Sequence, residues 1–313
     1  MLKKTTNSYL FQCVVLFLFL TSLFSQANAE WSAPLLQNHP LVGKIYSLDD
    51  QAYITEKTLI TDLQKSHYVL VGEKHDNEDH HRLELQLLES LLNKPHTRVV
   101  FEMLTDEQQS NIALLSSTDS KDQIHRKLSW NDKGWPWKDY APLIHNSLLK
   151  GANISAGNIN RATIKQIYQQ KNNDTLFNET PFKTLKNIPE VAKKQILNQV
   201  FESHCQLMPK AQLAPMMTIQ LTRDASMANA MLIGKEPSIL IAGSFHTQKN
   251  IGVPLHLRQV TKQTTKTVLL AEVRKNQLQP EDYASLSEAD YIWFTPKQVE
   301  KDYCASLRDK HKS

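Results

Sequence analysis

The chain has 313 residues, of which 41% are hydrophobic and 22% charged, with eight glycines, thirteen prolines and three cysteines. This composition excludes a disordered chain, a collagen-like repeat and a small scaffold built on disulfides. The formal net charge is +4 at pH 7 and no stretch forms a basic stripe, so nucleic acid is not expected as a partner.

The first 29 residues have the features of a secretory signal peptide. Lys3 and Lys4 form a basic start, residues 14–20 are an apolar run, and Ala-Asn-Ala at 27–29 is a typical cleavage site. The apolar run is too short for a membrane-spanning helix, which needs about 20 residues. We therefore expect cleavage after Ala29 and export to the periplasm, with no membrane span in the mature chain.

Export changes what the cysteines can do. Residues 30–313 keep only Cys205 and Cys304, an even number in an oxidising compartment. A disulfide between them is one interpretation and two independent thiols are the other, because no sequence signal brings the two residues together.

Strands and helices alternate along the exported chain. Asn77 is a typical cap for the helix after it, and further helices are predicted over 106–116 and 212–233. Strands at the spacing seen here require crossover connections, so we expect an α/β fold with a mostly parallel sheet flanked by helices. Residues 160–210 carry few strand signals and predict a smaller helical subdomain. The predicted strands cover 67–71, 97–101, 154–156, 238–242, 267–273 and 291–294.

Two glycine–histidine motifs directly follow predicted strands. Gly72 to His75 comes after the first strand, and Gly243 to His246 comes after the fourth. Open α/β sheets bind their ligands outside the carboxyl ends of the strands, and glycine allows a tight turn there. Both motifs are therefore expected at one edge of the sheet.

Two carboxylates accompany these motifs. Glu73 lies inside the first motif, and Glu102 ends the second predicted strand. We expect Glu73, Glu102, His75 and His246 to form one site, of the kind that binds a divalent metal or performs acid–base catalysis. Arg223, in the long predicted helix, is either a partner for an anion at this site or part of a surface ion pair.

Other polar and aromatic clusters carry weaker signals. Three of the five tryptophans lie between Trp130 and Tyr140, where Trp135-Pro136-Trp137 predicts a stiff aromatic turn. This cluster either stacks on a flat ligand or closes the core. His80 and His81 are adjacent at the start of a helix and share no face, so solvation accounts for them as well as function does.

Several motifs occur in one order along the chain, and together they resemble the ChaN-type haem-binding family of iron-regulated bacterial envelope proteins. The resemblance places the chain in a superfamily with the Tiki and TraB proteins, some of which are metal-dependent proteases, and more distantly near the erythromycin esterases. This chain departs from many relatives in lacking a lipoprotein signal. It departs from the family pattern in Ser244-Phe245 and Gln248-Lys249, which replace a more usual Gly-rich and basic stretch around the second histidine. The motifs are Val71–Asp76, Phe101–Met103, Gly134–Trp137 with Tyr140, Gln220–Ala228, Gly243–His246, Gly252–Leu257 and Asp290–Pro296.

The resemblance implies haem binding and a role in haem or iron uptake. For haem, we take Tyr140 as the candidate axial ligand, because phenolate favours ferric iron, with Trp135 and Trp137 as neighbouring aromatic surface. The expected partners are haem, a second copy of the chain over the other face of the haem, and an outer-membrane haem-uptake system.

A second function is left open. A metal-dependent hydrolase would use His75 or His246 as base or metal ligand, and Glu73 and Glu102 to hold the metal or activate a water. Arg223 would then hold an anionic group. Whether the protein is an enzyme does not follow from the sequence.

Overall fold

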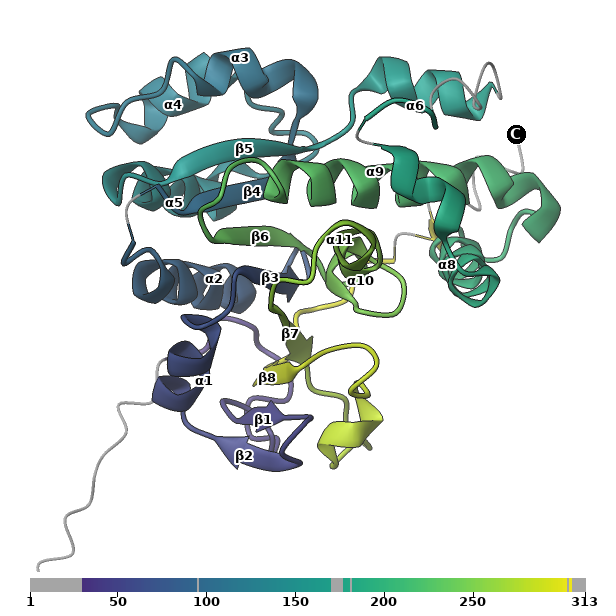
Figure 1. Cartoon of the computed structure of the whole chain (residues 1–313). Helices are drawn as coiled ribbons and strands as arrows, with labels where there is room; N and C mark the ends of the chain where they lie inside the picture. The colour runs from purple at the N-terminus through teal and green to yellow at the C-terminus, as the bar shows by residue number, and fades with distance from the viewer. Residues whose placement is uncertain (1–29, 95, 170–176, 181, 303, 306–313) are drawn as a thin grey trace, which may run out of the picture. The chain divides into compact units, whose positions relative to one another are not determined.

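An eight-stranded sheet forms the centre of the computed structural model, which describes residues 30–94, 96–169, 177–180, 182–302 and 304–305 (Figure 1). The order across the sheet is β2-β1-β8-β7-β3-β6-β4-β5, and strands β3 to β8 pair in parallel. This confirms the expected α/β fold. The strands are β1 (Ile45–Ser47), β2 (Ala52–Ile54), β3 (Tyr68–Glu73), β4 (Arg98–Thr105), β5 (Asn153–Asn158), β6 (Ser238–Gly243), β7 (Thr265–Glu272) and β8 (Tyr291–Thr295).

Helices cover both faces of this sheet (Figure 1). No helix among the described residues is long and apolar enough to cross a membrane. The α-helices are α1 (Glu56–Leu63), α2 (Glu78–Leu91), α3 (Gln109–Ile112), α4 (Lys121–Leu128), α5 (Trp137–Leu149), α6 (Arg161–Tyr168), α8 (Glu190–Ser203), α9 (Ala214–Met231), α10 (Ser244–Thr247) and α11 (Val253–Val260). The 3-10 helices are η1 (Asp106–Gln108), η2 (Phe182–Asn187), η3 (Lys210–Leu213) and η4 (Pro280–Asp282).

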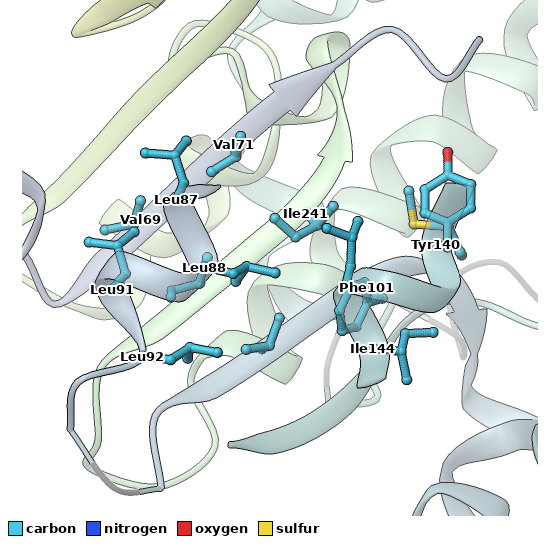
Figure 2. Close-up of a cluster of buried hydrophobic side chains, with 14 of the residues drawn as sticks. Val69, Val71, Leu87, Leu88, Leu91, Leu92, Phe101, Tyr140, Ile144 and Ile241 are labelled. Carbon is cyan, nitrogen blue, oxygen red and sulfur yellow. The ribbon is translucent and has the colours of Figure 1, made fainter. Parts of the chain in front are cut away.

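The two faces of the sheet bury different clusters of apolar side chains. Val69 and Val71 of β3 face α2 and belong to a core cluster that also includes side chains of α1, α4 and α5. Figure 2 shows part of this cluster, with Leu87 and Leu88 of α2 beside the sheet. Leu70 lies between these valines in sequence and faces α9 and α11, because successive side chains of a strand point to opposite faces.

The segment between β5 and α9 contributes helices and, among its described residues, no strand. Its apolar side chains, such as Ile167 of α6 and Ile196 of α8, pack on Ile219 and Leu221 of α9 in a separate cluster. The predicted helical subdomain at 160–210 covers this segment. The disulfide that the sequence left open is present, since Cys205 just after α8 is bonded to Cys304.

Several elements differ from the sequence predictions. The helix expected over 106–116 ends at Ile112, because the Asp119 carboxylate accepts a 2.7 Å hydrogen bond from the N–H of Ser116 and holds it in a turn. The long helix predicted over 212–233 is present as α9, which is continuous through Arg223. The antiparallel strands β1 and β2 were not predicted, since three residues each give too short a pattern.

The first described residues are tied to the start of α2. The buried Asp79 carboxylate accepts hydrogen bonds from the N–H groups of Ser32 and Ala33, at 3.0 and 2.9 Å. The Arg82 guanidinium lies 4.7 Å from the centre of the Trp31 ring. The predicted signal peptide, 1–29, lies outside the described residues.

Candidate functional site

Three neighbouring strands bring the predicted polar residues to one edge of the sheet. Glu73 ends β3 and pairs in register with Gly243, which ends β6. Glu102 lies near the end of β4, the next strand beyond β6. Glu73 and Glu102 are only 1% and 3% exposed. The carboxyl ends of these strands therefore hold two buried carboxylates at one edge of the sheet, on either side of β6.

The two glycine–histidine motifs interlock through their glycines. A Cβ on Gly72 would collide with Oγ1 of Thr247, which follows the second motif. A Cβ on Gly243 would lie 2.8 Å from Nε2 of His75, which belongs to the first. Each motif therefore needs glycine because the other occupies the space of its side chain.

His75 is the more exposed histidine of the site. Its Nδ1 forms a short hydrogen bond with Oε1 of Glu73, and 40% of its side chain is open to solvent. Its Nε2 lies 3.9 Å from Oε2 of Glu102, beyond hydrogen-bond distance. Burial opposes a charge on the ring, but Glu73 and Glu102 outweigh it and raise the pKa of His75 to about 9.

His246 belongs to a chain of acidic partners. Its Nδ1 lies 2.6 Å from Oδ1 of Asp224 on α9, and its Nε2 lies 3.4 Å from Oε1 of Glu102. The other oxygen of Glu102 accepts a 2.8 Å hydrogen bond from the N–H of Gly243. Burial opposes the charges, yet His246 and His75 lower the pKa of Glu102, and Glu102 and Asp224 raise that of His246. Burial raises the pKa of Asp224 to about 6.

Arg223 lies next to this chain on α9. Its charge helps to lower the pKa of Glu102 and opposes the rise in the pKa of Asp224, and its Nε is buried without a hydrogen-bond partner. The structure therefore brings together all five residues predicted for the strand-end site: Glu73, His75, Glu102, Arg223 and His246.

The aromatic residues expected around haem lie differently. Tyr140 is 0% exposed within α5, and its hydroxyl donates a 3.2 Å hydrogen bond to Oε1 of Glu73. Burial and the charge of Glu73 raise the pKa of this phenol well above its usual range. Direct ligation of haem iron by Tyr140 would require the side chain to leave this position and lose a proton that the site retains.

The tryptophans divide between the site and the core. The Trp135 ring lies 4.7 Å from the ring of His75, edge to face, and borders the site. Trp137 begins α5 and packs on Trp130 instead, with ring centres 4.9 Å apart. The stiff aromatic turn thus ends at the start of a helix, with Pro136 as its cap.

Two further histidines are buried behind the site, which excludes solvation, one of the two alternatives that the sequence left open for them. Nδ1 of His80 accepts a hydrogen bond from the N–H of Lys74 at 2.9 Å. His81 contacts Glu84 on the same helix, with 3.0 Å between Nδ1 and Oε2. Burial opposes its charge, but the hydrogen bond and charge of Glu84 raise the pKa of His81 to about 9.

Asp224, His81 and Glu84 were not predicted as site residues. Asp224 is adjacent to the predicted Arg223, and a carboxylate there could have been considered as a partner for either histidine. His81 and Glu84 are three residues apart, a spacing that places both on one helix face. That spacing indicates the pair but not what it faces, because the contact with β3 is made only in the folded chain.

Two hollows open beside His75, His246 and Gly243. One, of about 120 Å³, lies between α8, α9 and the strand ends and is lined by Gln220, Asp224 and His246. The other, of about 430 Å³, lies along the end of β7 and is lined by Lys74, Leu269 to Glu272 and Arg274. His75, Gly243 and Phe245 line both, and the Phe245 side chain is 56% exposed.

Comparison with known proteins places the chain in a family. The sequence profile described as "Haem-binding uptake, Tiki superfamily, ChaN" matches residues 59–257. ChaN of Campylobacter jejuni, solved with cofacial haem, is 25% identical with a TM-score of 0.68, over 80% of this chain and 95% of that one.

An erythromycin esterase, EreC in its open conformation, is 13% identical with a TM-score of 0.47, over 83% of this chain and 99% of that one. No curated protein matches the sequence. The family profile and the ChaN structure both support haem binding. The chain belongs to the ChaN family of haem-binding uptake proteins, in the Tiki superfamily.

Proposed function

We propose that this protein binds haem at the strand-end edge of the sheet, with His75 as the side chain that meets the iron, and handles haem for iron uptake in the bacterial envelope. The observation that carries the proposal is the pairing of His75 with Glu73. A half-exposed imidazole whose Nδ1 is held by a buried carboxylate keeps Nε2 for a metal. Histidines that bind metals almost always use such a partner, which fixes the ring and raises its basicity.

The surroundings of His75 fit an amphipathic, anionic macrocycle. The 430 Å³ hollow offers apolar surface from Phe245 and from Leu269 to Ala271. Lys74 and Arg274 line the same hollow and supply cations for carboxylates such as the propionates of haem. Buried apolar area would supply much of the affinity, and the histidine would supply the specificity for iron.

A second copy of the chain would cover the other face of the haem. The relative from Campylobacter jejuni binds haem cofacially, with porphyrin planes facing one another. A closed dimer with twofold symmetry brings two identical haem sites face to face without new contacts elsewhere. We expect haem to shift the protein from monomer to dimer, which light scattering after size exclusion would measure.

We infer export to the periplasm as part of this role, because a haem carrier working with an outer-membrane uptake system would receive its cargo there. The basis is the signal-like sequence before Glu30, together with a disulfide, which persists in oxidising compartments. Mass spectrometry of the exported protein should find a chain starting at Glu30. A chain that retains residues 1–29 would contradict the proposal on export and leave the haem site untouched.

Titration of the haem-free protein with ferric haem tests the binding site. We expect a Soret shift that saturates near one haem per chain. His75→Ala should change the spectrum and weaken binding by at least about tenfold, whereas His67→Ala, at the opposite end of β3, should change neither. An unchanged spectrum in His75→Ala would contradict the role of His75, and the absence of any Soret shift in the wild type would contradict haem binding itself.

One observation favours a second candidate function, hydrolysis. Asp224 holds Nδ1 of His246 at 2.6 Å, beside Glu102 and the 120 Å³ hollow. A histidine oriented by a buried carboxylate is the usual general base for activating a water. A panel of simple carboxylic esters would test this function. If the protein is a hydrolase, the rate of ester hydrolysis should fall by at least about 100-fold in His246→Ala. Equal hydrolysis rates in the wild type and the variant would exclude this function.

A further inference from the structure

Three buried side chains converge behind His75, on the side facing α2. Glu73, His81 and Glu84 each offer one nitrogen or oxygen atom, and these three atoms lie within 4.8 Å of one another. Their exposed fractions are 1%, 6% and 0%. The cluster therefore lies in the protein interior, and Glu73 alone of the three also lines one of the two hollows, the larger one.

Hydrogen bonding requires one positive centre between His81 and Glu84. Nε2 of His81 lies 3.2 Å from the backbone oxygen of His75, which can only accept, so the ring proton sits on Nε2. When the ring carries only this proton, Nδ1 of His81 presents a lone pair to Oε2 of Glu84 at 3.0 Å. Two acceptors at this distance need a cation between them, either a proton or a metal ion.

The carboxylates give a second, independent observation. Oε2 of Glu73 and Oε1 of Glu84 are buried and have no hydrogen-bond partner. Leaving a buried polar atom unpaired costs about 1–3 kcal/mol, and more where the group is charged. Both atoms belong to the side chains that converge with His81, so a ligand that all three can share would satisfy them together.

The remaining atoms of the cluster are already held in place. Oε1 of Glu73 accepts from the Tyr140 hydroxyl at 3.2 Å and contacts Nδ1 of His75. Nε2 of His81 donates to the backbone. Bonds of this kind, made by the atom that does not bind the metal, orient the ligands of metal sites.

We propose that Glu73, His81 and Glu84 form a binding site for one divalent first-row metal ion, such as Zn²⁺ or Mn²⁺. One imidazole and two carboxylates are a common ligand set for these ions. Ligand atoms around a tetrahedral Zn²⁺ lie about 3.3 Å apart, so the present spacing needs side-chain shifts of about 1 Å. The set differs from the one expected from the sequence: it keeps Glu73 but replaces His75, Glu102 and His246.

The site would connect to the surface through Glu73 alone. One oxygen of this carboxylate holds His75, and the other is buried without a hydrogen-bond partner. A bound metal would fix Glu73 and with it the orientation of His75. The metal site is distinct from the proposed haem site, because His81 and Glu84 line neither hollow and the two sites share only Glu73.

Metal analysis of the haem-free, disulfide-bonded protein tests the proposal. The protein is equilibrated with excess Zn²⁺ or Mn²⁺, both as folded protein and during refolding, then desalted and analysed for metal. We expect close to one ion per chain and a raised midpoint of thermal unfolding. Glu84→Gln keeps the volume of the side chain but should weaken binding by at least about 100-fold, beyond the loss caused by outer partners.

Two matched variants distinguish this site from a metal site at the strand ends and from adventitious surface binding. Glu89→Gln, on the exposed face of α2, should bind metal like the wild type. Glu102→Gln should also keep the metal, whereas a site built from His75, Glu102 and His246 would lose it. If the wild-type protein folds but retains neither Zn²⁺ nor Mn²⁺, the proposal is overturned, and a proton shared by His81 and Glu84 supplies the positive charge instead. Full binding by Glu84→Gln overturns it as well.

Discussion

Nε2 of His75 lies 2.8 Å from the place where a Cβ of residue 243 would be. Gly243 has a φ of −57°, a conformation that every amino acid adopts, so the backbone conformation does not require glycine at this position. Glycine is required because the imidazole of His75, in the other motif, occupies the space of a side chain. The two glycine–histidine motifs, about 170 residues apart in the sequence, therefore pack tightly against one another at Nε2 of His75, the atom that we propose coordinates the iron.

Gly243→Ala should therefore displace His75 without straining the backbone. The added methyl group forces the ring away from the strand ends, and overpacking of this kind costs about 1–3 kcal/mol. We expect a lower thermal unfolding midpoint and haem affinity weakened by about tenfold or more, measured by Soret titration. Ser244→Ala, one residue later and without added bulk, is the control. Wild-type haem affinity in Gly243→Ala would show that the position of His75 does not matter.

The sequence was sufficient to predict the sheet and the edge that carries the site. Apolar strands followed directly by Gly72 and Gly243 predict where parallel strands end, and parallel strands end at one edge. The contacts that set the chemistry could not be predicted. Asp224 reaches His246 only because α9 crosses the strand ends, and His81 reaches Glu73 only because α2 packs on β3.

Tyr140 shows why residue type alone misleads. A tyrosine next to a tryptophan cluster suits haem, but position 140 falls on the inner face of α5, where its ring is fully buried. Helix α5 itself was not predicted, and without it the direction of this side chain was undetermined. Its hydroxyl instead holds Glu73, which in turn holds His75.

Tyr140→Phe is therefore expected to act through His75 rather than on the iron. The substitution keeps the ring and removes one hydrogen bond to Glu73, whose net contribution is about 0.5–1.5 kcal/mol. We expect a haem spectrum close to that of the wild type and a modest loss of stability in denaturant unfolding. Loss of a tyrosinate charge-transfer band in this variant would instead identify Tyr140 as the ligand.

Haem binding through His75 should depend on pH. The pKa of His75 is raised to about 9, so the ring is protonated at neutral pH and iron must displace that proton. Affinity should rise by about tenfold for each pH unit below 9 and level off above it. Haem titrations at a series of pH values measure this slope. The slope should be lost in His75→Ala, and a wild-type affinity independent of pH would contradict ligation by His75.

The disulfide should contribute strongly to stability. Cys205 and Cys304 are separated by 99 positions, and closing a loop of that size stabilises a fold by about 4–5 kcal/mol in the chain-entropy model. Cys304→Ser should lower the free energy of unfolding by up to this amount, as measured in urea. Reductant should lower the stability of the wild type to the level of the variant and leave the variant unchanged. If reductant leaves the free energy of unfolding of the wild type unchanged, the bond contributes nothing to stability.

Acid should destabilise the protein through His256, a buried residue of α11 that is 1% exposed. Its Nδ1 forms a 2.7 Å hydrogen bond with Oγ1 of Thr184, and its Nε2 is buried without a partner. Burial, reinforced by the charge of Arg258, lowers the pKa of His256 to about 3. The folded protein therefore keeps this ring neutral down to about pH 3.

His256 binds a proton more readily in the unfolded chain than in the folded protein. In the unfolded chain this histidine titrates near pH 6.5, so between about pH 6.5 and 3 the unfolded state holds more protons, and stability falls as the pH falls. The cost is about 1.4 kcal/mol for each pH unit in that window. Comparing free energies of unfolding at pH 7 and pH 4.5 should show a smaller loss in His256→Asn, whose amide can still form a hydrogen bond with Thr184. Equal losses in the two proteins would mean that His256 is protonated in the folded state.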